Sequence, residues 1–174
     1  MSGAKNTLEP IVIKDYDPRW QILFQEEKAL LMEEIGHYVA EIQHIGSTAV
    51  EGLAAKPVID IMIGLRRILD SPDCIMPIEA MGYEYHPEFE DEFPERRYFR
   101  KMRGTTRTHQ IHMVEIDTDF WKRHLRFRDY LRANPESAQE YATLKRGLAE
   151  EHTNDREAYT NAKSEFIQEI LLGN

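Results

Sequence analysis

Residues 44–61, HIGSTAVEGLAAKPVIDI, contain the most informative pattern in the chain. An apolar segment ends at Gly46-Ser47, and a second apolar segment carries Asp60. A glycine turn after a strand brings backbone amides close to a phosphate, and a serine hydroxyl adds a donor. A carboxylate on the next strand can hold a divalent metal ion that bridges phosphates. Taken alone, the same pattern also fits an ordinary turn followed by a surface aspartate.

The strand predicted over 58–65 has two different faces. Its core face consists of Ile59, Ile61, Ile63 and Leu65, because alternate residues of a strand share a side. Asp60 and Met62 lie on the opposite face. Asp60 is therefore expected to point away from the main apolar core.

Further elements are predicted on both sides of this strand. Strands are expected at 11–13, 38–45, 96–102 and 110–116, the last two joined by a turn with Gly104. Helices are expected after Pro18 and over 75–81, 118–131, 136–151 and 155–172. Strands come first and helices last, which favours an α+β fold with a small mixed sheet. We expect one domain, with a sheet-containing core at about 9–117 and a helical part at about 118–172.

Composition narrows the functional classes. The 174 residues are 41% hydrophobic and carry a formal net charge of -9, which disfavours broad binding to nucleic acid. The single Cys74 excludes a disulfide within the chain. No apolar run approaches the roughly 20 residues of a membrane span, and residues 1–10 lack a signal-peptide core. We therefore expect a cytoplasmic protein without a membrane partner. No pattern specifies an oligomeric state.

Three predicted helices each place a cation on or beside their apolar face. They are Arg128, Lys145 and Lys163, and Lys56 precedes the Asp60 strand. A buried cation is costly unless it is paired or lies near an anion. The side chains can instead extend to water or pair with Glu27 or Asp60. Together they predict a shared anion pocket that could hold a triphosphate.

Several linked segments resemble one protein family, the GrpB family. They are 44–61, DPRW at 17–20, HLRFRDYLR at 124–132, YATLK at 141–145 and DREAYTNAK at 155–163. That family is similar to the nucleotidyltransferases that share the polymerase-β palm. The resemblance covers nearly the whole chain and implies a sheet of nucleotidyltransferase type with a helical C-terminal half.

The wider superfamily pattern is Gly-Ser, then Asp-x-Asp or Asp-x-Glu, then a third carboxylate on a neighbouring strand. Asp60 matches the first acid, but Met62 occupies the second position and His112 the region of the third. A thioether does not bind a hard cation such as Mg²⁺. Metal-assisted catalysis by the usual pair of ions is therefore in doubt for this chain.

The candidate residues follow from the pattern and the resemblance together. Asp60 and His112 are the candidate catalytic residues, and Asp60, His44 and His112 are candidate ligands for Mg²⁺ or Mn²⁺, or for Zn²⁺ through imidazole. Candidate nucleotide-binding residues are Gly46, Ser47, Thr48, Lys56, Arg128, Lys145, Tyr159 and Lys163. The two histidines can instead be sheet residues with satisfied hydrogen bonds. Arg97 or Arg100 would add a cation to the cleft, depending on which strand face meets it.

Three functions stay open at this point. The first is a metal-assisted nucleotidyltransferase that uses a nucleoside triphosphate and an unknown acceptor. The second is a nucleotide- or phosphometabolite-binding module without turnover, which Met62 favours. The third is a protein-interaction domain with a relict cleft. The substitution Met62→Asp would distinguish them if it strengthened metal binding.

Overall fold

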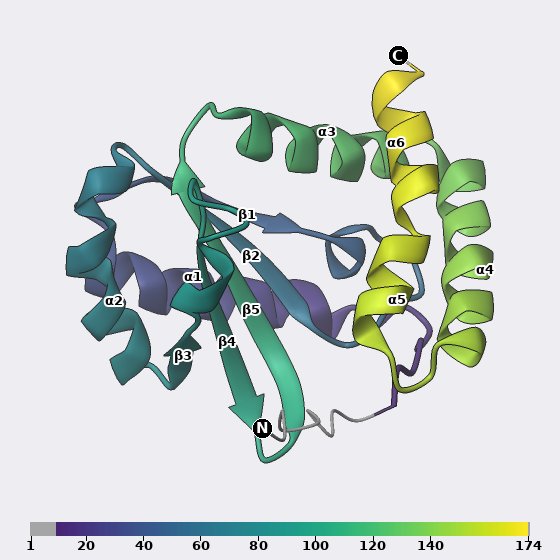
Figure 1. The fold of residues 1–174 in the computed structure, drawn as a ribbon, viewed down its shortest axis with the longest axis horizontal. Coiled ribbons are helices and arrows are strands. Elements are labelled where there is room, and N and C mark those ends of the chain that lie inside the picture. Colours follow the sequence, from purple (N-terminus) through teal and green to yellow (C-terminus); the bar gives the residue numbers. More distant parts are fainter. Residues whose placement is uncertain (1–9, 174) are drawn as a thin grey trace.

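The computed structural model describes residues 10–173, which form a mixed sheet with helices on both faces (Figure 1). The strands are β1 (Val39–Ile45), β2 (Ile59–Leu65), β3 (Tyr83–Tyr85), β4 (Arg97–Arg103) and β5 (Thr106–Glu115). Their order in the sheet is β1-β2-β5-β4-β3. The pairing of β2 with β5 is parallel, and the other pairings are antiparallel. The predicted α+β class with a mixed sheet is confirmed.

The helices begin and end at recognisable signals. They are α1 (Arg19–Ile35), α2 (Ser71–Ala80), α3 (Asp119–Ala133), α4 (Pro135–Glu151), α5 (Arg156–Ala162) and α6 (Ser164–Leu172). Pro135 occupies the first turn of α4, where its missing N–H costs nothing. Asp155 caps α5 by accepting a hydrogen bond from the backbone N–H of Ala158. No helix within residues 10–173 is long and apolar enough to cross a membrane.

The two faces of the sheet have different cores. The predicted core face of β2 packs with Trp20 and Phe24 of α1 and with Ile78 of α2. On the opposite face, Met62 packs with Phe120 and Trp121 of α3. Figure 1 shows α3 along one end of the sheet and α4, α5 and α6 grouped beside it. The sheet face that carries Asp60 therefore looks toward the C-terminal helices.

Two local expectations were wrong, and one alternative left open does not apply. Residues 11–13 form no strand; the N–H of Ile11 donates to the carbonyl of Thr153, and a single bridge joins Lys14 to Ala55. The helix expected over 155–172 divides at Lys163 into α5 and α6. Glu27 is buried in α1, but the cation that pairs with it is Lys101 of β4, at 2.8 Å, and not a helical lysine.

Candidate functional site

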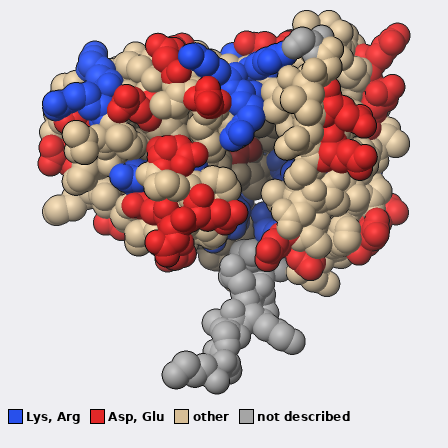
Figure 2. Space-filling model, turned by 45° about the horizontal axis from the view of Figure 1, so that its top comes forward, with Lys and Arg blue, Asp and Glu red and all other residues tan. Residues whose placement is uncertain are grey.

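A cavity of about 800 Å³ lies between the Asp60 face of the sheet and helices α4 and α5. Its lining draws on segments that are far apart in sequence. The lysines and arginines of this lining are Lys56, Arg96, Arg100, Arg107, Lys145, Arg156 and Lys163. The acids are Asp60, Glu92, Asp155 and Glu157. Figure 2 shows Lys and Arg along the hollow and Asp and Glu spread over the surface around it. An acidic protein thus has a locally cationic cavity.

The turn after β1 is built against the carboxylate of β2. Gly46 has a φ of 72°, a left-handed conformation that L side chains rarely adopt. A Cβ at this position would overlap Oδ2 of Asp60. Gly46 is therefore required both for the turn and for the close approach of Asp60. Ser47 and Thr48 continue the turn as a 3₁₀-helix, η1 (Ser47–Ala49), and both line the cavity.

Asp60 is held by its neighbour on β5. The Gln110 side-chain amide donates to Oδ1 of Asp60, and Nε2 of His112 lies 3.8 Å from the same oxygen. Gln110 in turn accepts hydrogen bonds from the Tyr98 hydroxyl at 2.6 Å and from Arg107 at 3.3 Å. Burial alone would raise the pKa of Asp60, but the contacts with His112 and Gln110 hold it below its usual value. Asp60 is therefore a carboxylate at neutral pH.

His112 links Asp60 to an arginine. Arg96 lies 3.4 Å from Nδ1 of His112, so the proton of the neutral ring belongs on Nε2, which faces Asp60. Burial lowers the pKa of His112, and the Asp60 carboxylate offsets that effect only in part. His112 is therefore neutral at pH 7.

Three lysines converge on the side of the cavity formed by the helices and the Gly46 turn. The Nζ atoms of Lys56 and Lys163 lie 4.9 and 4.4 Å from the ring centre of Tyr159. Lys145 lies 4.8 Å from the ring centre of Tyr141 and donates to the carbonyl of Ala54. None of these lysines forms an ion pair with a carboxylate among the described residues. We call Lys56, Lys145 and Lys163 the lysine cluster.

Burial lowers the pKa of each lysine in the cluster. The pKa is about 6 for Lys145, about 7 for Lys56 and about 8 for Lys163. Burial is the largest cause in each case, and Lys163 adds repulsion at Lys56 and Lys145. The cavity is therefore a place where positive charge is unfavourable until an anion enters.

Tyr159 provides a further polar group. Its side chain is 0% exposed, and its hydroxyl has no hydrogen-bond partner within residues 10–173. A buried hydroxyl without a partner costs free energy, so such groups point to a missing ligand or solvent contact. Tyr159 lines the cavity between Lys56 and Lys163, where its hydroxyl could donate a hydrogen bond to an oxygen of a bound anion.

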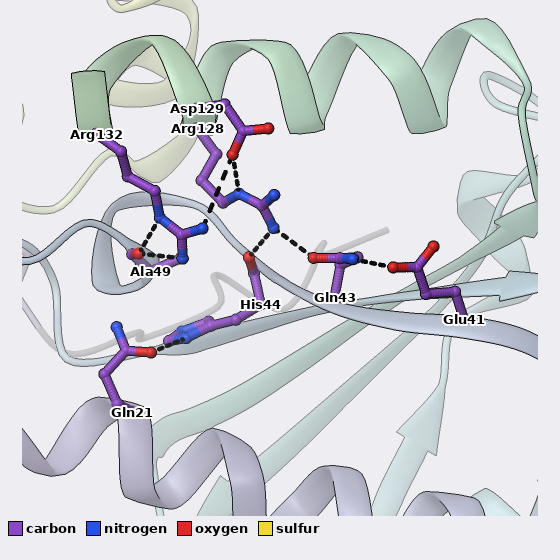
Figure 3. A network of polar contacts seen from close by, with 8 residues as sticks. All are labelled: Gln21, Glu41, Gln43, His44, Ala49, Arg128, Asp129 and Arg132. Atoms are coloured by element: carbon purple, nitrogen blue, oxygen red, sulfur yellow. Dashed lines mark hydrogen bonds and ion pairs between the residues drawn. The ribbon is translucent and has the colours of Figure 1, made fainter. Parts of the chain in front are cut away.

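Two predicted site residues, His44 and Arg128, do not line the cavity and belong to the network of polar contacts in Figure 3. His44 pairs with Ile61 on the α1 face, where it stacks on Phe24 with ring centres 4.6 Å apart. Arg128 donates to the Gln43 side chain at 2.6 Å and to the carbonyl of His44 at 3.0 Å. The placement of both in the pocket was wrong. They join α3 and α1 to the end of β1, just before the Gly46 turn.

The predicted ligand set for a metal ion does not form. Residues that lie directly opposite each other on β1 and β2 have their side chains on the same face of the sheet. Asp60 lies opposite Ile45, and His44 lies opposite Ile61, so the side chains of Asp60 and His44 are on different faces. Within the described chain, no group of three or more His, Cys, Asp or Glu side chains could hold a metal ion. Met62, at the second acid position, is 0% exposed and packs against Phe120 and Trp121. The residues present therefore do not fit a metal pair held by the protein.

Sequence reasoning missed part of the cavity wall. Either Arg97 or Arg100 was predicted to line the cavity. Arg100 does so, whereas Arg97 donates hydrogen bonds to the Ser71 hydroxyl and to the carbonyl of Pro94. Arg96 and Arg107 also line it. Alternation along β5 places Gln110 and His112 on one face, and the register of β4 with β5, in which Arg100 pairs with Gln110, adds Arg100 to that face.

The fold and cavity define the molecule as an α+β protein with a cationic cavity. The GrpB protein family matches residues 10–172, and the chain belongs to this family. The glutamate-rich protein GrpB of Alkalihalophilus pseudofirmus is 39% identical over 163 residues, covering 92% of this chain and 94% of that protein. A crystal structure of the conserved protein GrpB from Enterococcus faecalis has a TM-score of 0.85 and 37% identity, covering 93% of this chain and 96% of that chain. A more distant relative, a dephospho-CoA kinase of Mycolicibacterium paratuberculosis, is 25% identical and covers 92% of this chain but 45% of that protein.

Proposed function

We propose that the cavity binds a nucleoside triphosphate or another small molecule with several phosphates. The observation that carries this proposal is the lysine cluster, in which Lys145 is only 2% exposed and no lysine has a carboxylate within ion-pairing distance among the described residues. Such an arrangement costs folding free energy and becomes favourable when an anion occupies the space between the lysines.

A polyphosphate suits this site better than a single carboxylate ligand. The lysines come from three segments: the loop before β2, helix α4, and the junction of α5 and α6. Each can contact a different phosphate, and the Tyr159 hydroxyl can donate to an oxygen between them. Gly46 and Ser47 bring the turn to the same anion from the sheet side.

Nucleotidyl transfer is the second candidate, and the contact between Gly46 and Asp60 favours it. This contact reproduces the first part of the nucleotidyltransferase pattern, with Asp60 ionised beside the phosphate site. Met62 and Gln110 supply no further carboxylate, so a metal ion would have only Asp60 as an acidic ligand from this part of the chain. Binding without turnover is therefore the function that the geometry supports best.

The direct test is ligand-dependent stability and calorimetric affinity. The panel contains the four nucleoside triphosphates, inorganic tripolyphosphate and dephospho-coenzyme A, which is included because of the name of the M. paratuberculosis relative. Each is tested with Mg²⁺ and with a chelator. A ligand at 100 times its Kd should stabilise the protein by about 2.7 kcal/mol and raise Tm by several degrees.

Matched variants make the test specific. Lys163→Gln should weaken binding at least about tenfold because it removes one phosphate contact, each charged hydrogen bond being worth about 1.5–3 kcal/mol. Lys122→Gln, on the exposed side of α3, should leave affinity unchanged. Folded protein that binds no member of the panel would disprove the proposal and favour a protein-interaction role. Release of pyrophosphate from a nucleoside triphosphate would establish turnover in addition to binding, and transfer would require the nucleotidyl group to be found on an acceptor rather than as free monophosphate.

A further inference from the structure

In the loop between β3 and β4, two acidic side chains pair with residues outside the cavity, whereas Glu92 lines it. Glu88 pairs with His86 at 2.8 Å, and Glu90 lies 3.5 Å from Arg97, an arginine that does not line the cavity. Phe89 and Phe93 of the same loop are half-buried and line the cavity. An acidic loop thus contributes two aromatic rings to a cationic site.

Arginines of the adjoining segment lie against these rings. The Arg96 guanidinium is 4.6 Å from the ring centre of Phe93 and 4.9 Å from that of Tyr98. Arg100 is 5.2 Å from the ring centre of Phe89 and 5.1 Å from that of Tyr98. The planar groups alternate between cation and aromatic ring, an arrangement that holds each guanidinium in place.

Arg96 also has unused donor capacity. Its Nε is buried and has no hydrogen-bond partner among residues 10–173. One terminal nitrogen contacts His112, at the edge of the Asp60 site. Arg96 therefore links the aromatic rings to the Asp60 side of the cavity, with a donor that a ligand acceptor can satisfy.

We infer that Phe89, Phe93, Arg96 and Arg100 form a subsite for a planar nucleobase, and for a purine in preference to a pyrimidine. This inference rests on the proposed function, since the lysine cluster would hold the phosphates of the same ligand. Aromatic rings and guanidinium planes stack on bases, and a purine offers the larger surface. A purine also presents its N7 as a hydrogen-bond acceptor to arginine, and a pyrimidine has no N7. We call these four residues the base subsite.

The test separates the base from the phosphates by comparing ATP, GTP, CTP and tripolyphosphate in calorimetry. Purine triphosphates should bind about tenfold or more tightly than tripolyphosphate, the size of one base stacking contact. Arg96→Lys keeps the positive charge but removes the planar group. Phe93→Leu keeps an apolar side chain but removes the ring. Both variants should lose most of the purine advantage and bind tripolyphosphate within about twofold of the unmodified protein.

The control is Lys163→Gln, which should weaken all four ligands in parallel. Equal affinity of the unmodified protein for purine triphosphates and tripolyphosphate would overturn the base subsite while leaving the phosphate site intact. Parallel losses for every ligand in folded Arg96→Lys and Phe93→Leu would also overturn it, because these residues would then act on the phosphates. Failure of every ligand, tripolyphosphate included, would remove the proposed function and the base subsite with it.

Discussion

Replacement of Lys145 by methionine should stabilise the free protein at neutral pH. The pKa of this lysine falls from 10.5 to about 6, mainly through burial, so it is largely neutral in the folded protein at pH 7. In the unfolded chain it is protonated, and releasing that proton on folding at pH 7 costs about 5 kcal/mol. Methionine avoids this cost but loses the hydrogen bond to Ala54, worth about 1–3 kcal/mol when its acceptor stays buried. The net gain at pH 7 is about 2–4 kcal/mol.

The advantage of Lys145→Met should shrink as the pH rises. Between pH 7 and 9 the unfolded chain binds one proton more than the native state at this position. The stability of the unmodified protein therefore increases by about 1.4 kcal/mol per pH unit relative to the variant, and the two converge near pH 9. Urea denaturation at pH 7, 8 and 9 measures both quantities. Lys122→Met, at an exposed position on α3, is the control and should show neither effect.

A single outcome would refute this reasoning about Lys145. If Lys145→Met were less stable than the unmodified protein at pH 7, with a difference that did not change up to pH 9, the lysine would be solvated and charged in the native state. The lysine cluster would then be an ordinary surface feature. If Lys145→Met is instead more stable at pH 7 and loses this advantage as the pH rises, Lys145 lowers the stability of the free protein, as is common for residues of a binding site.

Three further outcomes are expected. Nucleotide affinity should fall as the pH rises from 6.5 to 8.5. A bound anion raises the pKa values of the three lysines, so that binding is accompanied by proton uptake. Calorimetry in two buffers of different ionisation enthalpy should show uptake of about one to two protons at pH 7. Gly46→Ala should destabilise the protein by about 1–3 kcal/mol and abolish binding, because of the positive φ and the overlap with Asp60; normal affinity would contradict the geometry of the turn. Arg128→Ala should cost about 2–4 kcal/mol in urea denaturation and leave the nucleotide affinity of the folded fraction unchanged, whereas a selective loss of affinity would return Arg128 to the pocket.

Strand parity made much of the site predictable. It placed Asp60 opposite the core face of β2, and the helical spacing identified Lys145 and Lys163, which line the cavity. The anion expected there stays a prediction. The same approach failed for His44, because a face on one strand says nothing about a neighbouring strand until the register is known. The register change between Val39 and Glu41 of β1 shifts the alternation there.

The rest of the site depends on contacts between distant segments. Arg128 follows the same helical spacing as the two lysines, yet it meets Gln43 and a backbone carbonyl rather than the cavity. From the sequence, Met62→Asp would restore the second acid of the nucleotidyltransferase pattern. In the structure it would bury a carboxylate beside Trp121 and is expected to unfold the protein, so it cannot serve as a test of metal binding. The division of the chain into a core and a helical part of one domain stays a prediction.

The parallel pairing of β2 with β5 has a consequence for how the protein folds. Strands β4 and β5 are joined by two residues and can form a hairpin early, whereas Asp60 and Gln110 meet only after the intervening chain has closed a loop of about 50 residues. The Asp60 carboxylate and the Gln110 amide that holds it are on the two strands, β2 and β5, whose pairing is expected to form late. The Asp60 part of the cavity therefore forms only when β2 and β5 pair, and a ligand of the proposed site would bind only molecules that have completed this central pairing of the sheet.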